Sequence, residues 1–209
     1  MADDSEEITR NDGPGMEAWE AWTPAEAAER LAAAGVVWWV VGGWAVDLFL
    51  GEQTRPHEDL EIALSRHDFP RLGQHLDSME FFVAGSGEIR ALSDAGEWAN
   101  DMHQRWVLEP EVQKWRLDVM LQPGDAETWV FRRDESITAP RVDMIGTTPD
   151  GIPFELPHGV LLYKAKAARP KDESDFAACL PRLDDRSREW LADALASVHP
   201  GHPWIGRLR

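Results

Sequence analysis

The sequence lacks the features that mark several large protein classes. Of its 209 residues only Cys179 is a cysteine, which excludes an internal disulfide and leaves too few thiolates for a zinc cluster. No apolar run approaches the roughly 20 residues that cross a bilayer, and the N-terminus MADDSEEITR lacks the basic and apolar parts of a signal peptide. We therefore expect a soluble, cytoplasmic protein without a membrane partner, in which Cys179 is a buried helix thiol.

Basic residues are also scarce. The chain has 21 lysines and arginines against 38 acids, a formal net charge of −17. Nucleic acids and anionic membranes are bound chiefly by lysine and arginine, so this charge argues against both as partners and favours cationic ones. HExxH, paired-cysteine and G-x-S-x-G motifs are missing, so zincin, zinc-finger and serine-hydrolase functions have no support.

The residues that are present predict three parts. Residues 1–15 are polar and acidic and contain Gly-Pro-Gly, so we expect a flexible acidic tail there. Helical and alternating patterns follow over residues 16–150, and three helical segments follow over 151–209. The stretch 146–157, with three prolines and two glycines, is the expected boundary between a main domain and a small C-terminal helical unit.

One helix in the main domain has clear start signals. Thr23 can cap it, Pro24 stands at the first helical position, and Glu26 completes a T-x-x-E capping box. We expect the helix to begin directly after Thr23.

Two adjacent glycines follow an apolar strand. The stretch 36–41 (VVWWVV) is β-branched and aromatic, as expected of a strand that is covered on both faces, and it leads into Gly42 and Gly43. A short helix is expected next, with Gly51 as its stop. Glycines let the backbone approach an anion, and the first N–H groups of a helix favour phosphate, although a glycine pair alone is equally compatible with ordinary packing.

Acids stand on the polar faces of two other predicted strands. The stretch 59–64 alternates with Asp59 and Glu61 on one face, and the stretch 115–121 alternates with Asp118 on its polar face. Carboxylates two residues apart on a strand converge on one volume, where a divalent cation such as Mg²⁺ relieves their repulsion. If the two strands pair, Asp118 supplies a third acid; the alternative for all three is a solvated strand face.

This combination of glycines and acids resembles the DNA polymerase beta nucleotidyltransferase superfamily. More closely, VVGGWAVDLFLGEQTRPHEDLEI resembles the opening of the aminoglycoside 2″-adenylyltransferase and lincosamide nucleotidyltransferase families. These families share G-G-W-(A/G)-x-D, a G-x-x-T-R-x-H stretch and D-x-(D/E). The resemblance implies an α+β fold: a nucleotidyltransferase domain with a mixed β-sheet flanked by helices, plus the small helical unit.

The same resemblance implies roles for the acids. Asp59 and Glu61 would ligate Mg²⁺, and Asp118 would be the catalytic base or a third metal ligand. Glu61 stands where the antibiotic-resistance enzymes commonly have aspartate, which lengthens the reach of that carboxylate by one methylene. Asp47, one helical turn after the glycines, is interpreted either as part of the site or as a hydrogen-bonding residue of the local turn.

Other residues are expected to bind the nucleotide. Gly42 and Gly43 would hold the triphosphate, with Arg55 and His57 near the phosphates. Lys164, from the helical unit, would reach the triphosphate. For Arg55, His57 and Lys164 the alternative is a solvated surface position.

The function implied is Mg²⁺-dependent transfer of a nucleoside monophosphate, expected to be AMP from ATP, onto a hydroxyl of a small acceptor. The acidic composition suits a cationic acceptor such as an aminoglycoside antibiotic. Two alternatives remain: transfer onto a protein or an RNA end, as in toxin and antitoxin members of the superfamily, and a degenerate domain that binds nucleotide without catalysis.

The chain has eleven tryptophans, and they divide into two groups. Those in apolar periodic patterns are expected in the core: Trp38, Trp39, Trp115 and Trp190. Outside such patterns, Trp98, Trp106 and Trp129 are freer to line an acceptor pocket.

Overall fold

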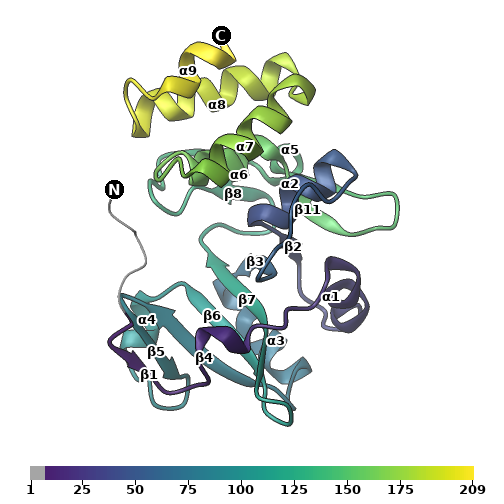
Figure 1. The fold of residues 1–209 in the computed structure, drawn as a ribbon, viewed down its shortest axis with the longest axis vertical. Helices are drawn as coiled ribbons and strands as arrows, with labels where there is room; N and C mark the ends of the chain where they lie inside the picture. Colours follow the sequence, from purple (N-terminus) through teal and green to yellow (C-terminus); the bar gives the residue numbers. More distant parts are fainter. Residues whose placement is uncertain (1–7) are drawn as a thin grey trace. The chain divides into compact units, whose positions relative to one another are not determined.

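A computed structural model describes residues 8–209, and the chain divides into two compact units (Figure 1). Unit 1 consists of Met1–Trp38 and His57–Gln122, and unit 2 of Trp39–Pro56 and Pro123–Arg209. This division differs from the single boundary expected near residue 150. The segment Trp39–Pro56 and the strands that follow residue 122 cluster with the C-terminal helices, and such long-range contacts leave no compositional mark on the chain.

Unit 1 is built on a mixed sheet. Its strands are β1 (Arg10–Asn11), β3 (Glu61–Ser65), β4 (Glu80–Gly85), β5 (Glu88–Ala91), β6 (Gln104–Glu109) and β7 (Lys114–Gln122). Their order is β1-β5-β4-β6-β7-β3, in which β1 runs parallel to β5 and β3 parallel to β7, whereas the other neighbours are antiparallel. The strand expected over 115–121 is present as β7, and the α+β class is confirmed. The strand expected over 59–64 begins only at Glu61, so Asp59 lies just before β3 and not on its polar face.

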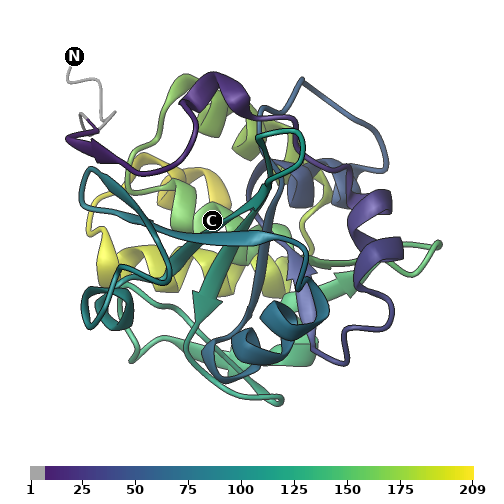
Figure 2. The same ribbon diagram turned by 90° about the horizontal axis from the view of Figure 1, so that it is seen from below.

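The helices of unit 1 are short. They are α1 (Pro24–Leu31), α3 (Phe69–His75) and α4 (Trp98–Asp101), with 3₁₀ turns η1 (Met16–Ala18) and η2 (Arg66–Asp68). The expected capping box is confirmed, because Thr23 accepts a hydrogen bond from the Glu26 backbone and the Glu26 carboxylate accepts one from the Thr23 backbone. His75 on α3 contacts the backbone oxygen of Arg30 at 2.7 Å, which joins α3 to α1. Figure 2 shows the ribbon of unit 1 from below.

The N-terminal residues that the structure describes are not the loose tail expected over 1–15. Arg10 and Asn11 form β1, and the Thr9 N–H donates to the Gly87 oxygen at 2.7 Å. Both residues of β1 are exposed, so backbone hydrogen bonding to a sheet edge orders this segment without apolar burial. The first seven residues of the expected tail lie outside the described residues.

Unit 2 contains two groups of short strands. They are β2 (Trp38–Val40), β8 (Thr128–Val130), β9 (Thr138–Pro140), β10 (Ile145–Thr147) and β11 (Pro153–Glu155). β11 pairs parallel to β2 and antiparallel to β10, and β8 pairs with β9. The glycine- and proline-rich stretch 146–157, expected as a boundary, is therefore mainly the β10–β11 hairpin inside unit 2.

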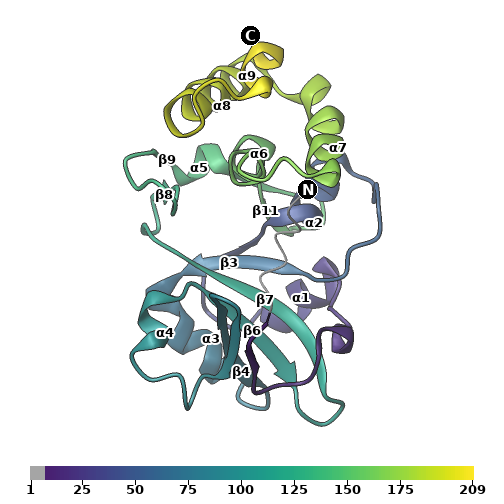
Figure 3. The ribbon, with the colours of Figure 1, turned by 60° about the vertical axis from the view of Figure 1, so that its left-hand side comes forward.

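The helices of unit 2 include all three expected C-terminal segments. They are α2 (Gly42–Leu50), α5 (Arg141–Met144), α6 (Pro157–Lys164), α7 (Pro170–Cys179), α8 (Asp185–Val198) and α9 (Pro203–Leu208), with the 3₁₀ turn η3 (Leu180–Arg182). α9 packs along α8 (Figure 3). Phe176 of α7 stacks on Trp204 of α9 with ring centroids 4.3 Å apart. None of the helices in the described part of the chain is long and apolar enough to span a membrane.

Most tryptophans are core residues, including two that were expected to be free. Trp38, Trp39 and Trp115 are buried as predicted, and Trp190 is half-buried. The expectation that Trp106 and Trp129 line an acceptor pocket is wrong. Trp106 packs edge-on against Trp115, and buried Trp129 donates its indole N–H to Glu155 at 2.7 Å. Trp106 also packs edge-on against Trp19, which is far away in the sequence, and Glu155 is 26 residues from Trp129, so local periodicity did not reveal this burial.

Candidate active site

Two acids face each other across neighbouring strands of unit 1. Glu61 on β3 is the direct partner of Asp118 on β7, and on the other side of β7 Asp118 is opposite Trp106 of β6. Adjacent strands lie about 4.8 Å apart, and directly opposite residues project from the same face of a sheet. The expectation that the strand of Asp118 pairs beside the strand of Glu61 is therefore confirmed.

Asp118 is buried in an unusual environment for a carboxylate. Its side chain is 2% exposed, and Gln104 donates to its Oδ2 at 2.5 Å. Among the described residues no hydrogen-bond donor reaches its Oδ1. The Trp106 indole lies close enough to lower the Asp118 pKa slightly but outside hydrogen-bond geometry.

The pKa of Asp118 is raised well above its ordinary value. Burial is the largest cause and the negative charge of Glu61 the next; the hydrogen bond from Gln104 opposes them, and the charge of Asp59 adds to them. A proton or a cation relieves such crowding of acids, and carboxylate oxygens are the ligands that Mg²⁺ prefers.

The acids of unit 1 fit a metal by their chemistry, although they are not assembled around a common point. Glu61 and Asp118 are in register, and Asp118 offers a buried oxygen without a hydrogen bond. Within residues 8–209, no three His, Cys, Asp or Glu side chains already have the arrangement of a metal site. A role of Asp59 as a third ligand stays a prediction.

In unit 2 the two glycines open a helix, as the sequence indicates. Gly42 has φ +67°, a left-handed conformation that side chains disfavour, and α2 begins at this residue. The preceding residue, Val41, makes no side-chain cap. The N–H groups of the first turn therefore suit an anion, as the phosphate prediction for Gly42 and Gly43 requires.

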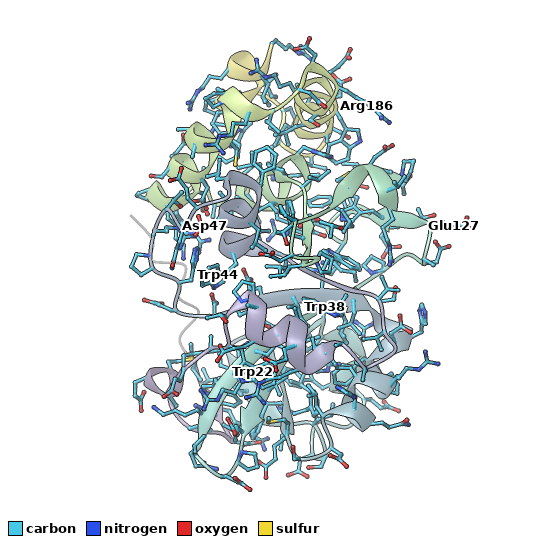
Figure 4. All side chains as sticks on the ribbon, turned by 90° about the vertical axis from the view of Figure 1, so that its right-hand side faces the viewer. Trp22, Trp38, Trp44, Asp47, Glu127 and Arg186 are labelled. Atoms are coloured by element: carbon cyan, nitrogen blue, oxygen red, sulfur yellow. The ribbon has the colours of Figure 1, made fainter. Side chains whose placement is uncertain are left out.

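Asp47 explains why two parts of the sequence motif occur together. It is buried on α2, and its Oδ1 accepts hydrogen bonds from the Thr54 N–H at 3.1 Å and the Thr54 hydroxyl at 2.5 Å. Figure 4 shows Asp47 on α2. Gly51 ends that helix with φ +76°. Asp47 thus hydrogen-bonds to the loop after α2, and the bond fixes the residue that precedes Arg55. A role of Asp47 in the site stays a prediction.

Arg55 and Lys164 contact acids that the sequence did not single out. Lys164 Nζ lies 2.9 Å from Asp175 and 3.3 Å from Asp172, and its side chain is only 9% exposed. The Arg55 guanidinium lies 3.5 Å from Asp175 and is 26% exposed. Lys164 is therefore not the solvated surface lysine considered as its alternative. The three-residue spacing of Asp172 and Asp175 in KDESDF, on one helix face, was the available signal for this pair.

The two units divide the predicted site residues between them. Unit 1 contains His57, Asp59, Glu61 and Asp118. Unit 2 contains Gly42, Gly43, Arg55 and Lys164. Within the units, the structure brings Glu61 to Asp118, and it brings Arg55 and Lys164 to one shared acid. His57 is half-buried in the loop before β3.

The class of fold is confirmed by solved structures. A crystal structure of ANT(2″)-Ia in complex with adenylyl-2″-tobramycin matches 83% of this chain and 95% of its own with a TM-score of 0.53, at 15% identity. A solution structure of the antibiotic-resistance factor ANT(2″)-Ia matches 87% of this chain and 95% of its own with a TM-score of 0.52, at 14% identity. The chain therefore has the fold of these nucleotidyltransferases.

The family resemblance is confirmed more locally. The family model for aminoglycoside-2″-adenylyltransferase matches residues 25–93. That range contains the glycines, the T-R-x-H stretch and the Asp59–Glu61 pair, whereas Asp118 and Lys164 lie outside it. No curated protein matches the chain significantly. Together the family match and the fold support an adenylyltransferase enzyme.

Proposed function

We propose that the chain is a nucleotidyltransferase that moves a nucleoside monophosphate, AMP from ATP, onto a hydroxyl of a small, cationic, antibiotic-like acceptor with Mg²⁺ as cofactor. The observation that carries the proposal is the position of Asp118, buried in register with Glu61 and with one oxygen that no donor in the described chain satisfies. The family match over residues 25–93 supports it.

The acids of unit 1 would bind the metal. Asp59, Glu61 and Asp118 supply oxygen ligands, and a divalent cation would offset the mutual repulsion that raises the Asp118 pKa. When bound, Mg²⁺ would neutralise the phosphate oxygens and polarise the phosphorus that is attacked.

The alternative to metal binding by Asp118 is that it acts as the base for this transfer, with Asp59 and Glu61 as the metal ligands. The acceptor hydroxyl oxygen would form a bond to the α-phosphorus, the bond from that phosphorus to the pyrophosphate oxygen would break, and pyrophosphate would leave. The hydroxyl proton would pass to the Asp118 carboxylate. Because burial and the charge of Glu61 raise its pKa, this carboxylate holds a proton more readily than an ordinary aspartate.

Unit 2 and the adjoining loop would bind the triphosphate. The first N–H groups of α2, at Gly42 and Gly43, suit phosphate oxygens, and Arg55 and His57 would add charge. Of the two cations of unit 2 that are predicted to bind the triphosphate, Arg55 is the better direct ligand, because its side chain is 26% exposed and that of Lys164 is 9% exposed. Lys164 would act mainly by balancing the charge of buried acids.

A small cationic acceptor is supported by composition and by one structural relative. The net charge of −17 favours cationic molecules at encounter. The ANT(2″)-Ia crystal structure is a complex with adenylyl-2″-tobramycin, an adenylylated aminoglycoside. We therefore assign the acceptor to the same chemical class, a polyhydroxylated amine.

The test is a screen of acceptors and nucleotides. The purified chain is incubated with aminoglycosides and lincosamides, each with ATP, GTP, CTP or UTP and Mg²⁺, and pyrophosphate release and product mass are measured. We expect ATP-dependent adenylylation of at least one aminoglycoside. Asp118→Asn should lower kcat/KM by about 10²–10⁴-fold, the usual contribution of a general base.

The matched control is Asp77→Asn, which makes the same chemical change at an exposed acid of unit 1. It should leave kcat/KM within about twofold of the parent, because exposed charges interact weakly. Pyrophosphate release with none of the acceptors would contradict the proposal. A labelled protein band from lysate with ATP, without a small-molecule product, would replace it with protein modification.

A further inference from the structure

Unit 2 contains a buried network of charged side chains around α7. Asp172 and Asp175 are 0% and 3% exposed, and Lys164 contacts both of them. Arg169 pairs with Asp172 at 2.9 Å, and Arg55 pairs with Asp175 at 3.5 Å. Two buried acids thus meet three cations, of which the Lys164 side chain is 9% exposed, that of Arg55 26% and that of Arg169 54%.

The two acids have different local roles. Asp172 belongs to the capping box of α7, because its carboxylate accepts the backbone N–H of Arg169 at 3.0 Å as well as the Arg169 side chain. Helix initiation therefore accounts for Asp172. Asp175 lies one turn further inside α7, and its Oδ2 contacts Lys164 at 2.9 Å and Arg55 at 3.5 Å.

The contact between Asp175 and Arg55 joins distant parts of the sequence. Arg55 lies 120 residues before Asp175, in the loop after α2. The residue before it, Thr54, is held to Asp47 of α2 by its backbone and its hydroxyl. The Arg55 backbone is therefore restrained through Thr54, and its guanidinium is restrained through Asp175.

We propose that Asp175 is a positioning residue of the nucleotide site: by its contact with the Arg55 guanidinium it holds that side chain in one orientation, ready to bind triphosphate. This rests on the proposed function, in which Arg55 contacts phosphate. A flexible arginine loses conformational freedom when it binds an anion, and a side chain that is already held loses less. Asp172, which pairs with Lys164 and Arg169, serves as the control for this role.

The matched pair of variants is Asp175→Asn and Asp172→Asn. Both remove one charge from a buried acid of α7 and both leave Lys164 with one acidic partner, but only the first removes the carboxylate that holds Arg55. We expect Asp175→Asn to raise the calorimetric Kd for MgATP by about tenfold and KM for ATP similarly, with kcat within threefold. Asp172→Asn should leave Kd within threefold while lowering Tm, because it removes the α7 cap.

Two further measurements separate positioning from a general loss of structure. In the protein without nucleotide, the Arg55 Nε–Hε NMR signal should be sharp in the parent and in Asp172→Asn but broadened in Asp175→Asn. In an Arg55→Ala background, Asp175→Asn should change the Kd for MgATP by less than twofold. If Asp175→Asn does not fold, Asp175→Glu takes its place, with an expected threefold rise in Kd because the carboxylate is displaced.

The outcomes are distinguishable from failure of the proposed function. A parent protein that binds no MgATP overturns the proposed function and this proposal together. Normal binding by the parent with unchanged binding by Asp175→Asn overturns only the role of Asp175. Equal weakening by Asp172→Asn and Asp175→Asn, or a loss that persists in Arg55→Ala, also overturns that role.

Discussion

Buried carboxylates on α7 of unit 2 and on β7 of unit 1 have their negative charge balanced in opposite ways. In unit 2, Asp172 and Asp175 contact lysine and arginine, and although burial alone would raise it, the pKa of Asp172 is lowered, chiefly by Arg169 and Lys164. In unit 1, Asp118 receives one hydrogen bond from the neutral amide of Gln104, and burial together with the charges of Glu61 and Asp59 raises its pKa.

This difference in charge balance distinguishes an ion network that stabilises the fold, around α7, from a group suited to chemistry, Asp118. Ion pairs between acids and cations restrain the side chains that form them, and removal of one member of a buried pair leaves the charge of the other without a partner. An acid crowded by other acids destabilises its own ionised form and favours whatever neutralises it, either a proton or a metal. Variants at the two kinds of acid should therefore affect activity and stability differently.

The largest effect is expected at Asp118, where a substitution should lower activity without lowering stability. Asp118→Asn should lower kcat/KM by about 10²–10⁴-fold. Its unfolding free energy, measured by urea titration at pH 7, should stay equal or rise, because a raised pKa means that ionisation of this group costs stability at neutral pH. If the unfolding free energy falls by more than about 2 kcal/mol, the usual cost of disrupting a buried group, Asp118 contributes to stability in the way the α7 acids do.

At Asp172 we expect the opposite: a substitution should lower stability without lowering activity. Asp172→Asn should lower the unfolding free energy by about 3 kcal/mol, because it removes a buried negative charge that pairs with Lys164 and Arg169 and weakens the capping box of α7. The folded variant should keep its activity. Its control is Asp184→Ala, which removes the exposed cap of α8 and should cost only about 1 kcal/mol. Equal losses from the two caps would contradict a special role of the buried network.

The reactivity of Cys179, on α7 next to this network, measures how well unit 2 excludes solvent. Burial, with a smaller contribution from Asp175, raises the pKa of its thiol to about 12. The native protein at pH 8 should therefore resist iodoacetamide, since the thiolate is the reactive form, and should be alkylated fully in denaturant. Mass spectrometry measures both states. Rapid alkylation of the native protein would mean that the network is open to water.

The smallest effect is a pH slope from His158. Burial lowers the pKa of this histidine, whose Nε2 lies 3.1 Å from the Asp143 backbone oxygen. The unfolded chain binds the proton at about pH 6.5 while the folded chain does not, so stability is present above that pH and falls as the pH is lowered through it. Urea midpoints between pH 7.5 and 5 should decline, and less steeply in His158→Asn. Parallel declines would remove His158 as the cause.

Local signals in the sequence were sufficient for the helix and strand pattern around the site. Thr23 and Glu26 predict the capping box of α1, Gly51 predicts the end of α2, and the alternation over 115–121 predicts β7. These features depend on residues within a few positions of one another, through backbone sterics and side-chain spacing. For the same reason the candidate acids could be named, because their strand positions follow from the alternation.

Long-range packing was needed for the partners of those residues. The register that sets Glu61 opposite Asp118 joins strands more than fifty residues apart, and the acids that hold Arg55 and Lys164 come from α7. The packing of Trp106 against Trp19 and the pairing of β1 with β5 likewise depend on distant segments. The helices and strands near the site, and the acids and cations that they contain, therefore follow from local features of the sequence. Which of these acids and cations pair with one another follows from the tertiary structure, because burial and pairing depend on contacts between segments far apart in the chain.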